Sequence, residues 1–488
     1  MFTRLTDRRA RLAAALNLTD EILLIGAGTP VPLPENTDQT YPFRAHAEFF
    51  YVAGVECPGA IATFDPQDGP RDGWKLFVPE VTEGEHVWEA REQVAGEPLA
   101  GLPAWITERR VRPIAGLGAP LPGVRTDEAL TAKVREVFSH AREVFSHARR
   151  PKDDLELSAM RQAANATAAG YAKAAAIIAP GVTERAVQIE LEAEFFRHGA
   201  TRTGYGTIVG TGPNSAVLHF EPTARAAQAG EFILIDAGAE VGRYVIDVTR
   251  TYVAGLPSAF QRDLYQVVLA AQEAAVACCV VGAEWRDVHL QCAVDMTAGL
   301  VSLGLMHGNA ESLVEQEAHL LFFPHGIGHL VGLGVRDASG TLPGRPRSTR
   351  ASLKNLRMDF PLAAGYVVTV EPGLYFIPAL LTDPKRREKF RDCVVWEKVE
   401  PHLALGGVRI EDNVLVTSGA PEVLTAAIPK ALQPCSSPIG ETRGHDAGGQ
   451  SGPHHRTAAE KRTPVSNAQS VRPLTPQAGP HADPHDRQ

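Results

Sequence analysis

The stretch LIDAGAEVGRYVIDVTRTY, residues 234–252, places two aspartates at the ends of two apolar runs. Asp236 ends the run FILI, and Asp247 ends the run YVI. Both runs have the composition of buried strands, in which carboxylates are rarely left unpaired. If Val241–Gly242 forms a two-residue hairpin turn, Asp236 lies directly opposite Asp247 on one face of the sheet. Two ionised acids at that distance repel each other, so the stretch predicts a site that takes up protons or cations.

Two further acids and a pair of histidines lie beside apolar strands. Glu371 follows the run VVTV and precedes Pro-Gly, whereas Glu411 lies inside the apolar segment VRIEDNVLV. His325 and His329 belong to FFPHGIGHLVGLG, whose glycines argue against the helix of an HExxH zinc peptidase. Taken singly, each acid could be a turn residue and each histidine a core residue. Together, four carboxylates and an imidazole suit two divalent cations such as Mn²⁺, which activate water for hydrolysis, better than one structural zinc.

The composition is that of a large globular chain. Its 488 residues, 44% of them hydrophobic, suggest roughly two to four domains with a sizeable core. A net charge of −9 without a long basic cluster argues against nucleic-acid binding, and no apolar run reaches the length of a membrane span. The N-terminal segment is predicted to be a surface helix rather than a secretion signal. The six cysteines include no CxxC pair, which favours reduced thiols and a cytoplasmic protein.

The chain divides into three regions by pattern. Residues 1–150 mix helices with the apolar strands EILLI, GAIATF and KLFVP, which predicts a smaller α/β domain. Residues 151–430 open with an Ala-rich helix, a Pro-Gly break and a second helix with Thr183 as its N-cap, and they contain all the acids described above. Residues 431–488 hold eight prolines and no aromatic residue, so we expect this tail to be disordered.

A seven-residue repeat precedes the second region. REVFSHA occurs twice in residues 135–148, which predicts a short helix with heptad-like spacing. We interpret it as a helix that links the two domains; a dimerisation seam is the alternative, although two heptads are few for a coiled coil. In the helix after Thr183, the residues Val187, Leu191 and Phe195 recur every four positions and predict a face buried in the core.

Five segments, LIDAGAE, IDVTRTY, PHGIGH, VEPGLYF and GVRIED, occur in an order that resembles the dinuclear pita-bread metallopeptidases of the M24 family. The resemblance is closest to the proline-specific members, Xaa-Pro dipeptidase (prolidase) and Xaa-Pro aminopeptidase (aminopeptidase P). It runs from about residue 36 to residue 430 and includes NTDQTYPFRAHAEFFYVAGVECPGAI and GTGPNSAVLHFEP. It implies an α+β fold, with a pita-bread catalytic domain after an aminopeptidase P-like N-terminal domain. It also implies a homodimer that hydrolyses small peptides with proline at position two.

The resemblance implies a role for each residue of the set. Asp236 would bind one metal ion, His329 and Glu371 the other, and Asp247 and Glu411 would bridge both. The implied cofactors are two divalent ions, Mn²⁺ first, with Co²⁺ or Zn²⁺ as alternatives. Glu371 would pass a proton to the proline nitrogen that leaves, and two histidines would assist, His219 and His325. The expected substrate contacts are His219, His325, Arg336, Arg357 and Arg409.

Two arginines bear on the choice of substrate. Arg336 stands in GVRDASG where these peptidases commonly have V-H-D. A guanidinium is always charged and cannot act as a neutral imidazole, but it can hold an oxyanion or a carboxylate. Arg357 aligns with the arginine that holds the free carboxylate of a dipeptide in prolidases, unless it is only a solvated surface cation.

The sequence leaves three functions open. Arg357 and the long segment before Glu371 favour an Xaa-Pro dipeptidase. The motif LIDAGAEVGRY and the short spacing from His219 to Asp236 favour an aminopeptidase P as the alternative. A pita-bread binding module without metals is the third reading, and the presence of all five ligand residues argues against it.

Overall fold

The computed structural model describes residues 2–34, 39–109, 112–118, 128–354 and 356–432. Contacts between residues group positions 1–438 into one compact unit, to which all of these belong. The tail predicted to be disordered, 431–488, lies outside the described residues from position 433 on.

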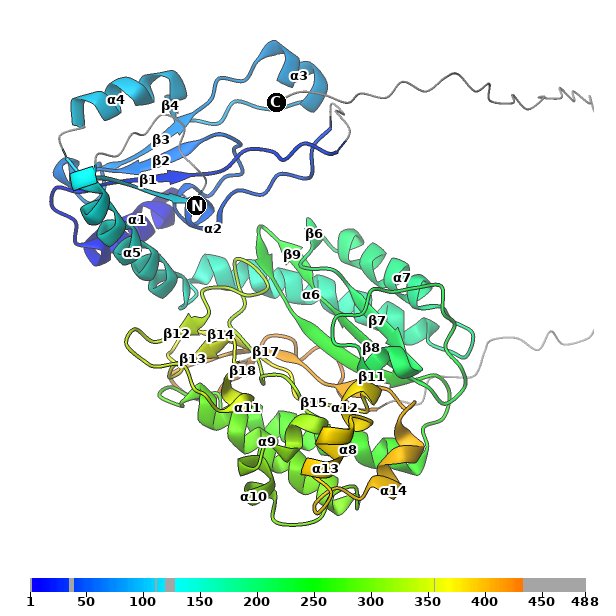
Figure 1. Cartoon of the computed structure of the whole chain (residues 1–488). Helices are drawn as coiled ribbons and strands as arrows, with labels where there is room; N and C mark the ends of the chain where they lie inside the picture. The colour runs from blue at the N-terminus through cyan, green and yellow to red at the C-terminus, as the bar shows by residue number, and fades with distance from the viewer. Residues whose placement is uncertain (1, 35–38, 110–111, 119–127, 355, 433–488) are drawn as a thin grey trace, which may run out of the picture. The chain divides into compact units, whose positions relative to one another are not determined.

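The N-terminal part is built on a five-stranded sheet with the order β4-β3-β2-β1-β5. The three predicted strands are present as β1 (Ile22–Gly26), β2 (Ile61–Phe64) and β3 (Trp74–Val78), joined by β4 (Glu97–Pro98) and β5 (Ile114–Gly118). Helix α4 (Leu102–Arg109) covers one face of the sheet through Leu102 and Trp105. The helices on the other side of the sheet are α1 (Phe2–Leu16), α2 (Ala47–Ala53) and α5 (Glu128–Arg149) (Figure 1).

The seven-residue repeat lies on α5 and faces the core. Val137, Ala141 and Phe145, four residues apart, are all buried. These three residues pack inside the chain, as expected for a linking helix, whereas Phe138 of the same repeat is exposed, and the dimerisation seam stays a prediction.

The helical pair that follows agrees with the sequence. Helix α6 (Asp154–Ile177) is followed by α7 (Glu184–Arg197), whose N-cap Thr183 accepts a hydrogen bond from the backbone N–H of Ala186. The predicted core face of α7 is fully buried, at Val187, Leu191 and Phe195. Apolar spacing of four residues on a helix was sufficient to predict this face.

The second part is a layered α+β structure around short antiparallel sheets. One sheet has the order β11-β8-β7, and another has the order β14-β17-β18. Their strands are β7 (Ile208–Thr211), β8 (Phe232–Ala237), β11 (Val248–Val253), β14 (Val367–Val370), β17 (Asp412–Leu415) and β18 (Glu422–Val423). A third pair is formed by β15 (Gly373–Tyr375) and β16 (Gly407–Arg409). A bridge between Thr249 and Glu411 connects the two larger sheets.

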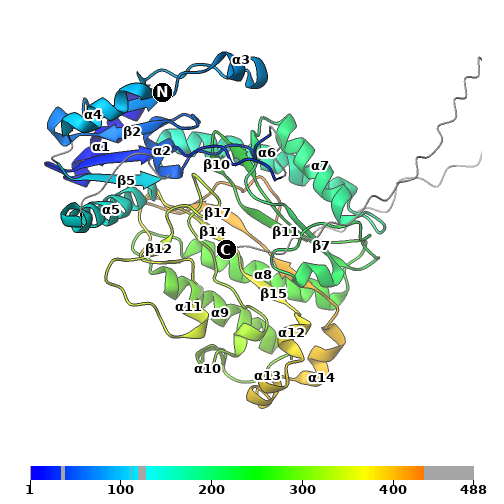
Figure 2. The same ribbon diagram turned by 45° about the horizontal axis from the view of Figure 1, so that its top comes forward.

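Helices cover these strands from both sides. Helices α6 and α7 contact the strands near β7, while α8 (Ala259–Ala277) contacts β14, β15 and β16 (Figure 2). Helix α9 (Trp285–Ser302) packs on α8. The remaining elements are α3 (Glu83–Glu89), β6 (Arg202–Thr203), β9 (Ala239–Val241), β10 (Tyr244–Val245), α10 (Ala310–Glu315), β12 (Gly340–Thr341), α11 (Ala351–Lys354), β13 (Met358–Asp359), α12 (Pro378–Leu381), α13 (Pro384–Lys389) and α14 (Trp396–Val399).

The central hairpin has a different register from the predicted one. Its turn is Gly242–Arg243, and both residues have positive φ, 55° and 77°. Positive φ at both central positions is the geometry of the hairpin turn that matches strand twist. Thr249, and not Asp247, therefore lies opposite Asp236. The prediction was wrong because it placed the turn one residue early, at Val241–Gly242.

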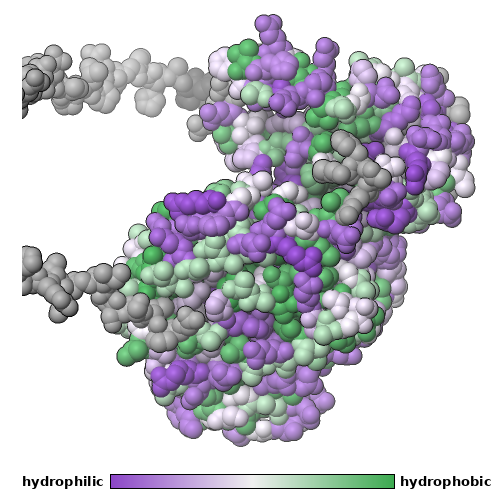
Figure 3. Space-filling view, turned by 180° about the vertical axis from the view of Figure 1, so that it is seen from behind, coloured by the Kyte–Doolittle hydropathy of each residue, from purple (hydrophilic) through white to green (hydrophobic). Residues whose placement is uncertain are grey.

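The described helices include none that is both long and apolar enough to cross a membrane. On the face drawn in Figure 3, strongly hydrophilic residues are spread among weakly hydrophobic ones.

Candidate metal centre

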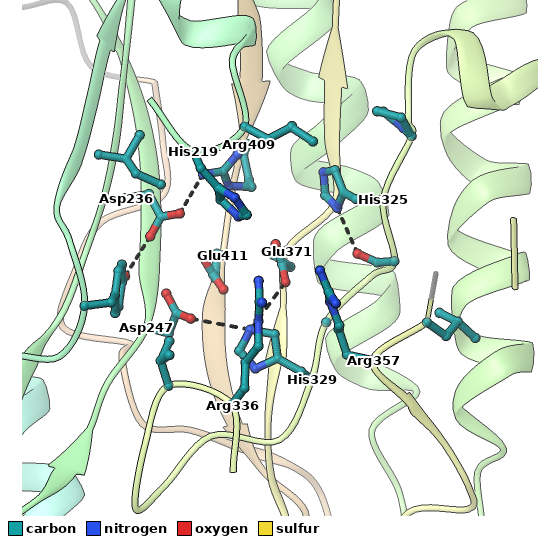
Figure 4. A pocket seen from close by; sticks show the side chains of 18 of the residues that line it. His219, Asp236, Asp247, His325, His329, Arg336, Arg357, Glu371, Arg409 and Glu411 are labelled. Carbon is teal, nitrogen blue, oxygen red and sulfur yellow. Dashed lines mark hydrogen bonds and ion pairs between the residues drawn. The ribbon is translucent and has the colours of Figure 1, made fainter. Parts of the chain in front are cut away.

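The ten predicted site residues all line one cavity of about 1100 Å³ in the second part (Figure 4). Strand ends bring the acids there. Asp236 lies near the end of β8, and Asp247 directly precedes β11. Glu371 directly follows β14, and Glu411 lies between β16 and β17. Each acid thus stands where an apolar strand begins or ends, as predicted for Asp236, Asp247 and Glu371, whereas Glu411, predicted inside an apolar segment, lies at the break between two strands.

Three of these residues form a compact ligand set. Asp247, His329 and Glu411 are buried and offer ligand atoms that all lie within 4.8 Å of one another. The Nε2 atom of His329 is 3.5 Å from Asp247 Oδ2 and 3.7 Å from Glu371 Oε1. Its Nδ1 atom lies 3.1 Å from the carbonyl oxygen of Leu330, to which it donates. This bond selects the tautomer in which Nε2 carries a lone pair directed at the acids.

Without cations nearby, the surroundings of these acids disfavour the charged form of their carboxyl groups. Burial, reinforced by the charge of Asp236, raises the pKa of Asp247 well above its usual value. Burial and the neighbouring Asp247 do the same to the pKa of Glu411. Burial raises the pKa of Glu371 to about 7, although Arg409 acts in the opposite direction. Several carboxyl groups with raised pKa at one point fit a site that divalent cations complete.

Neighbouring side chains hold the acids in place. The hydroxyl group of Tyr205 donates to Asp236 Oδ1 at 2.6 Å, and Arg409 Nη2 donates to Asp236 Oδ2 at 2.6 Å. The hydroxyl group of Thr249 donates to Glu411 Oε2 at 2.6 Å. Such bonds orient ligand oxygens and raise the affinity of a metal site. The sequence contained a signal for Thr249, which lies two residues after Asp247 and thus on the same strand face, but none for Tyr205.

His325 belongs to a hydrogen-bonded chain. Its Nδ1 atom donates to the carbonyl oxygen of Gly326 at 2.8 Å, and its Nε2 atom is 2.9 Å from the hydroxyl oxygen of Tyr375. That hydroxyl also accepts a hydrogen bond from Arg409 Nη1 at 3.0 Å, so it donates its own proton to His325. Burial lowers the pKa of His325 to about 3, which keeps the ring neutral. Tyr375 was not predicted from the sequence.

The other predicted contacts lie on the open side of the cavity. His219, Arg336 and Arg357 are exposed and line its wall. Burial and the charge of Arg336 lower the pKa of His219. Arg409, in contrast, is buried, and its guanidinium is engaged with Asp236, Thr249 and Tyr375.

Two family profiles match the chain, and together they cover both parts. The profile of metallopeptidase family M24 matches residues 158–418, and the aminopeptidase P N-terminal domain matches residues 5–96. The Xaa-Pro aminopeptidase of Haemophilus influenzae is 30% identical over 444 residues, which covers 87% of this chain and 94% of that protein.

Solved structures agree with this match. The aminopeptidase PepP of Pseudomonas aeruginosa has a TM-score of 0.71 at 27% identity, with coverage of 88% of this chain and 96% of that one. Proline aminopeptidase P II from Yersinia pestis has a TM-score of 0.71 at 26% identity, with coverage of 88% and 98%. The predicted fold, a pita-bread domain after an aminopeptidase P-like N-terminal domain, is thus confirmed, and so is the prediction of a metallopeptidase. The chain belongs to metallopeptidase family M24, among its Xaa-Pro peptidases.

Proposed function

We propose that this protein is an Xaa-Pro aminopeptidase that releases the N-terminal residue of peptides with proline at position two. The observation that carries the proposal is the compact set of Asp247, His329 and Glu411, with Glu371 and Asp236 beside it. The relatives named Xaa-Pro aminopeptidase support this reading over the dipeptidase that the sequence favoured.

The donor set fits two divalent metal ions, for which Mn²⁺ is the first choice. Carboxylates with one imidazole suit such hard or borderline cations. The ions would supply Lewis-acid activation of water and of the carbonyl group before proline. The residues that would hold them are Asp236, Asp247, His329, Glu371 and Glu411.

The remaining groups of the chain divide the work of proton transfer and positioning. Glu371 is the most accessible of the four acids, with 20% of its side chain exposed against 12% for Asp236 and 7% for Asp247, while Glu411 is buried. We assign it the transfer of a proton to the leaving proline nitrogen. The bonds of Arg409 to Asp236 make it a positioning residue, and its predicted substrate contact stays a prediction.

The experiment that tests the proposal is the substitution Asp247→Asn. The purified variant is incubated with Mn²⁺, its metal content is measured, and hydrolysis of Ala-Pro-Ala is followed by the released alanine. We expect loss of bound metal and a fall in kcat/KM of at least roughly a hundredfold. Asp392→Asn, at an exposed aspartate outside the cavity lining, is the matched control. A fully active, metal-replete Asp247→Asn variant would contradict the proposal.

An Xaa-Pro dipeptidase is the second candidate, because Arg357 lines the cavity with its guanidinium unpaired among the described residues. Comparison of Ala-Pro with Ala-Pro-Ala decides between the two. Faster hydrolysis of the dipeptide would give Arg357 the role of holding its free carboxylate, whereas faster hydrolysis of the tripeptide supports the aminopeptidase.

We also propose a cellular compartment and an oligomeric state for the protein. All five cysteines among the described residues are free thiols, which supports a reducing compartment such as the cytoplasm. The homodimer that the resemblance implies stays a prediction, which sedimentation of the purified protein tests.

A further inference from the structure

Four basic side chains on the cavity wall have no partner among the described residues. They are exposed, and none makes a side-chain hydrogen bond or an ion pair with another residue that the structure describes. We call them the cationic wall: Arg336, Arg347, Lys354 and Arg357.

Other arginines of the same chain segment are neutralised. Arg345 bonds to Glu284 and Asp359, and Arg350 bonds to Glu317. The segment therefore pairs the arginines that lie outside the cavity and leaves unpaired those that line it. A cation without an acidic partner in a cavity is available to a ligand.

The cationic wall lies beside the metal-binding residues. Figure 4 shows Arg336 and Arg357 reaching toward Glu371 and His329, with Asp236 on the other side of the cavity.

The backbone next to Arg336 is held rigidly. The carboxylate of Asp337 is fully buried between Lys152 and Arg149, and its Oδ2 atom is 3.1 Å from Lys152 Nζ. The same oxygen accepts a hydrogen bond from the backbone N–H of Leu333 at 3.1 Å. This support fixes the backbone position from which Arg336 projects, so that binding a ligand orders its side chain but not its backbone.

Few acids of the cavity remain to neutralise the cationic wall. Two divalent cations would offset the four acids of the centre, and Asp359 is already paired with Arg286 and Arg345. Among the described residues, the lining acid without such a partner is Glu221, against the cationic wall and Arg185, whose bonds go to uncharged groups. The open part of the loaded cavity would therefore be positive.

We propose that the cationic wall binds a carboxylate of the substrate beyond its proline, so that the enzyme prefers short or acidic peptides. This inference rests on the proposed function, because it concerns the same cavity. The carboxylate could be the free C-terminus of a short peptide or an acidic side chain after proline, and arginine forks bind both alike.

Matched peptides test the inference with the Mn²⁺-loaded enzyme. Ala-Pro-Ala is compared with Ala-Pro-Ala-NH₂, and Ala-Pro-Glu-NH₂ with Ala-Pro-Gln-NH₂, so that each pair differs by one negative charge. We expect the acidic member to have a kcat/KM roughly tenfold higher or more, mainly through a lower KM. A preference in the first pair alone identifies the C-terminal carboxylate, and a preference in both includes acidic side chains.

Substitutions of single arginines test whether the preference for the acidic peptide depends on the cationic wall. Arg336→Gln should bring the ratio between acid and amide close to one while the amide is still hydrolysed, and Arg336→Lys should retain part of the ratio. Arg391→Gln, an exposed arginine away from the cavity, should leave the ratio unchanged.

Three results would overturn the inference. Equal kcat/KM for acid and amide, with both hydrolysed, removes it and leaves the peptidase assignment standing. A ratio that persists in Arg336→Gln and in Arg357→Gln removes it as well. Hydrolysis of none of the four peptides would remove both the inference and the proposed function.

Discussion

One buried arginine organises much of the centre at the scale of single residues. Arg409 donates hydrogen bonds to Asp236, Thr249 and Tyr375, and through Tyr375 it reaches His325. The two oxygens of Asp236 are thereby divided between Arg409 and Tyr205. A carboxylate held on both oxygens keeps one orientation, which a metal ligand needs.

The Tyr205→Phe variant removes one of these bonds without changing the shape of the side chain. We expect kcat/KM for Ala-Pro-Ala to fall roughly tenfold, because a hydrogen bond to a charged group is lost and Asp236 becomes free to rotate. Tyr41→Phe, at an exposed tyrosine, is the control. Unchanged kinetics in Tyr205→Phe would show that Asp236 does not depend on this bond.

At the scale of elements, the hairpin of β8 and β11 depends on a close approach of two backbones. A Cβ atom on Gly238 would clash with the carbonyl oxygen of Ile246. Only glycine fits there, and this contact brings Asp247 next to the strand that carries Asp236.

The Gly238→Ala variant should push the two arms of the hairpin apart. We expect a loss of about 1–3 kcal/mol in the free energy of unfolding, as for other overpacked sites, together with weaker binding of Mn²⁺. Urea unfolding and metal titration measure the two effects. Gly101→Ala, where a Cβ atom meets nothing within 4 Å, should change neither. Full stability with Gly238→Ala would mean that the arms can separate freely.

At the scale of the whole molecule, two buried histidines couple stability to pH. Burial lowers the pKa of His289 to about 3 and that of His319 to about 4. In the unfolded chain both would titrate near 6.5. Below that pH the unfolded chain takes up protons that the folded chain refuses, so acid favours unfolding.

We therefore expect the free energy of unfolding to decrease as the pH falls from about 6.5 toward 4. Each of the two histidines should contribute a slope of up to about 1.4 kcal/mol per pH unit. Urea unfolding at a series of pH values measures this slope, and His319→Gln should reduce it. The same slope in the wild type and in the variant would contradict the assignment, because titration of the other groups is common to both.

Contacts between the two parts of the chain decide details that no local pattern contains. Arg243 has positive φ in the hairpin turn, and its guanidinium binds Glu56 and the carbonyl oxygen of Ala45 in the N-terminal part. These partners are nearly two hundred positions away in the sequence. The register of the hairpin, and with it the opposition of Asp236 and Thr249, therefore could not be predicted from the stretch itself.

The sequence by itself determined the strands, the capped helix after Thr183 and the identity of the ligand candidates. Apolar runs and helical spacing are local, and an acid at the end of a buried strand is visible without any knowledge of its neighbours. Only the tertiary structure decided the partners of those acids, Tyr205, Thr249 and Arg409, because hydrogen bonds between distant segments leave no periodic trace. It also decided which arginines remain unpaired in the cavity, since charge neutralisation depends on distances in space and not on order along the chain.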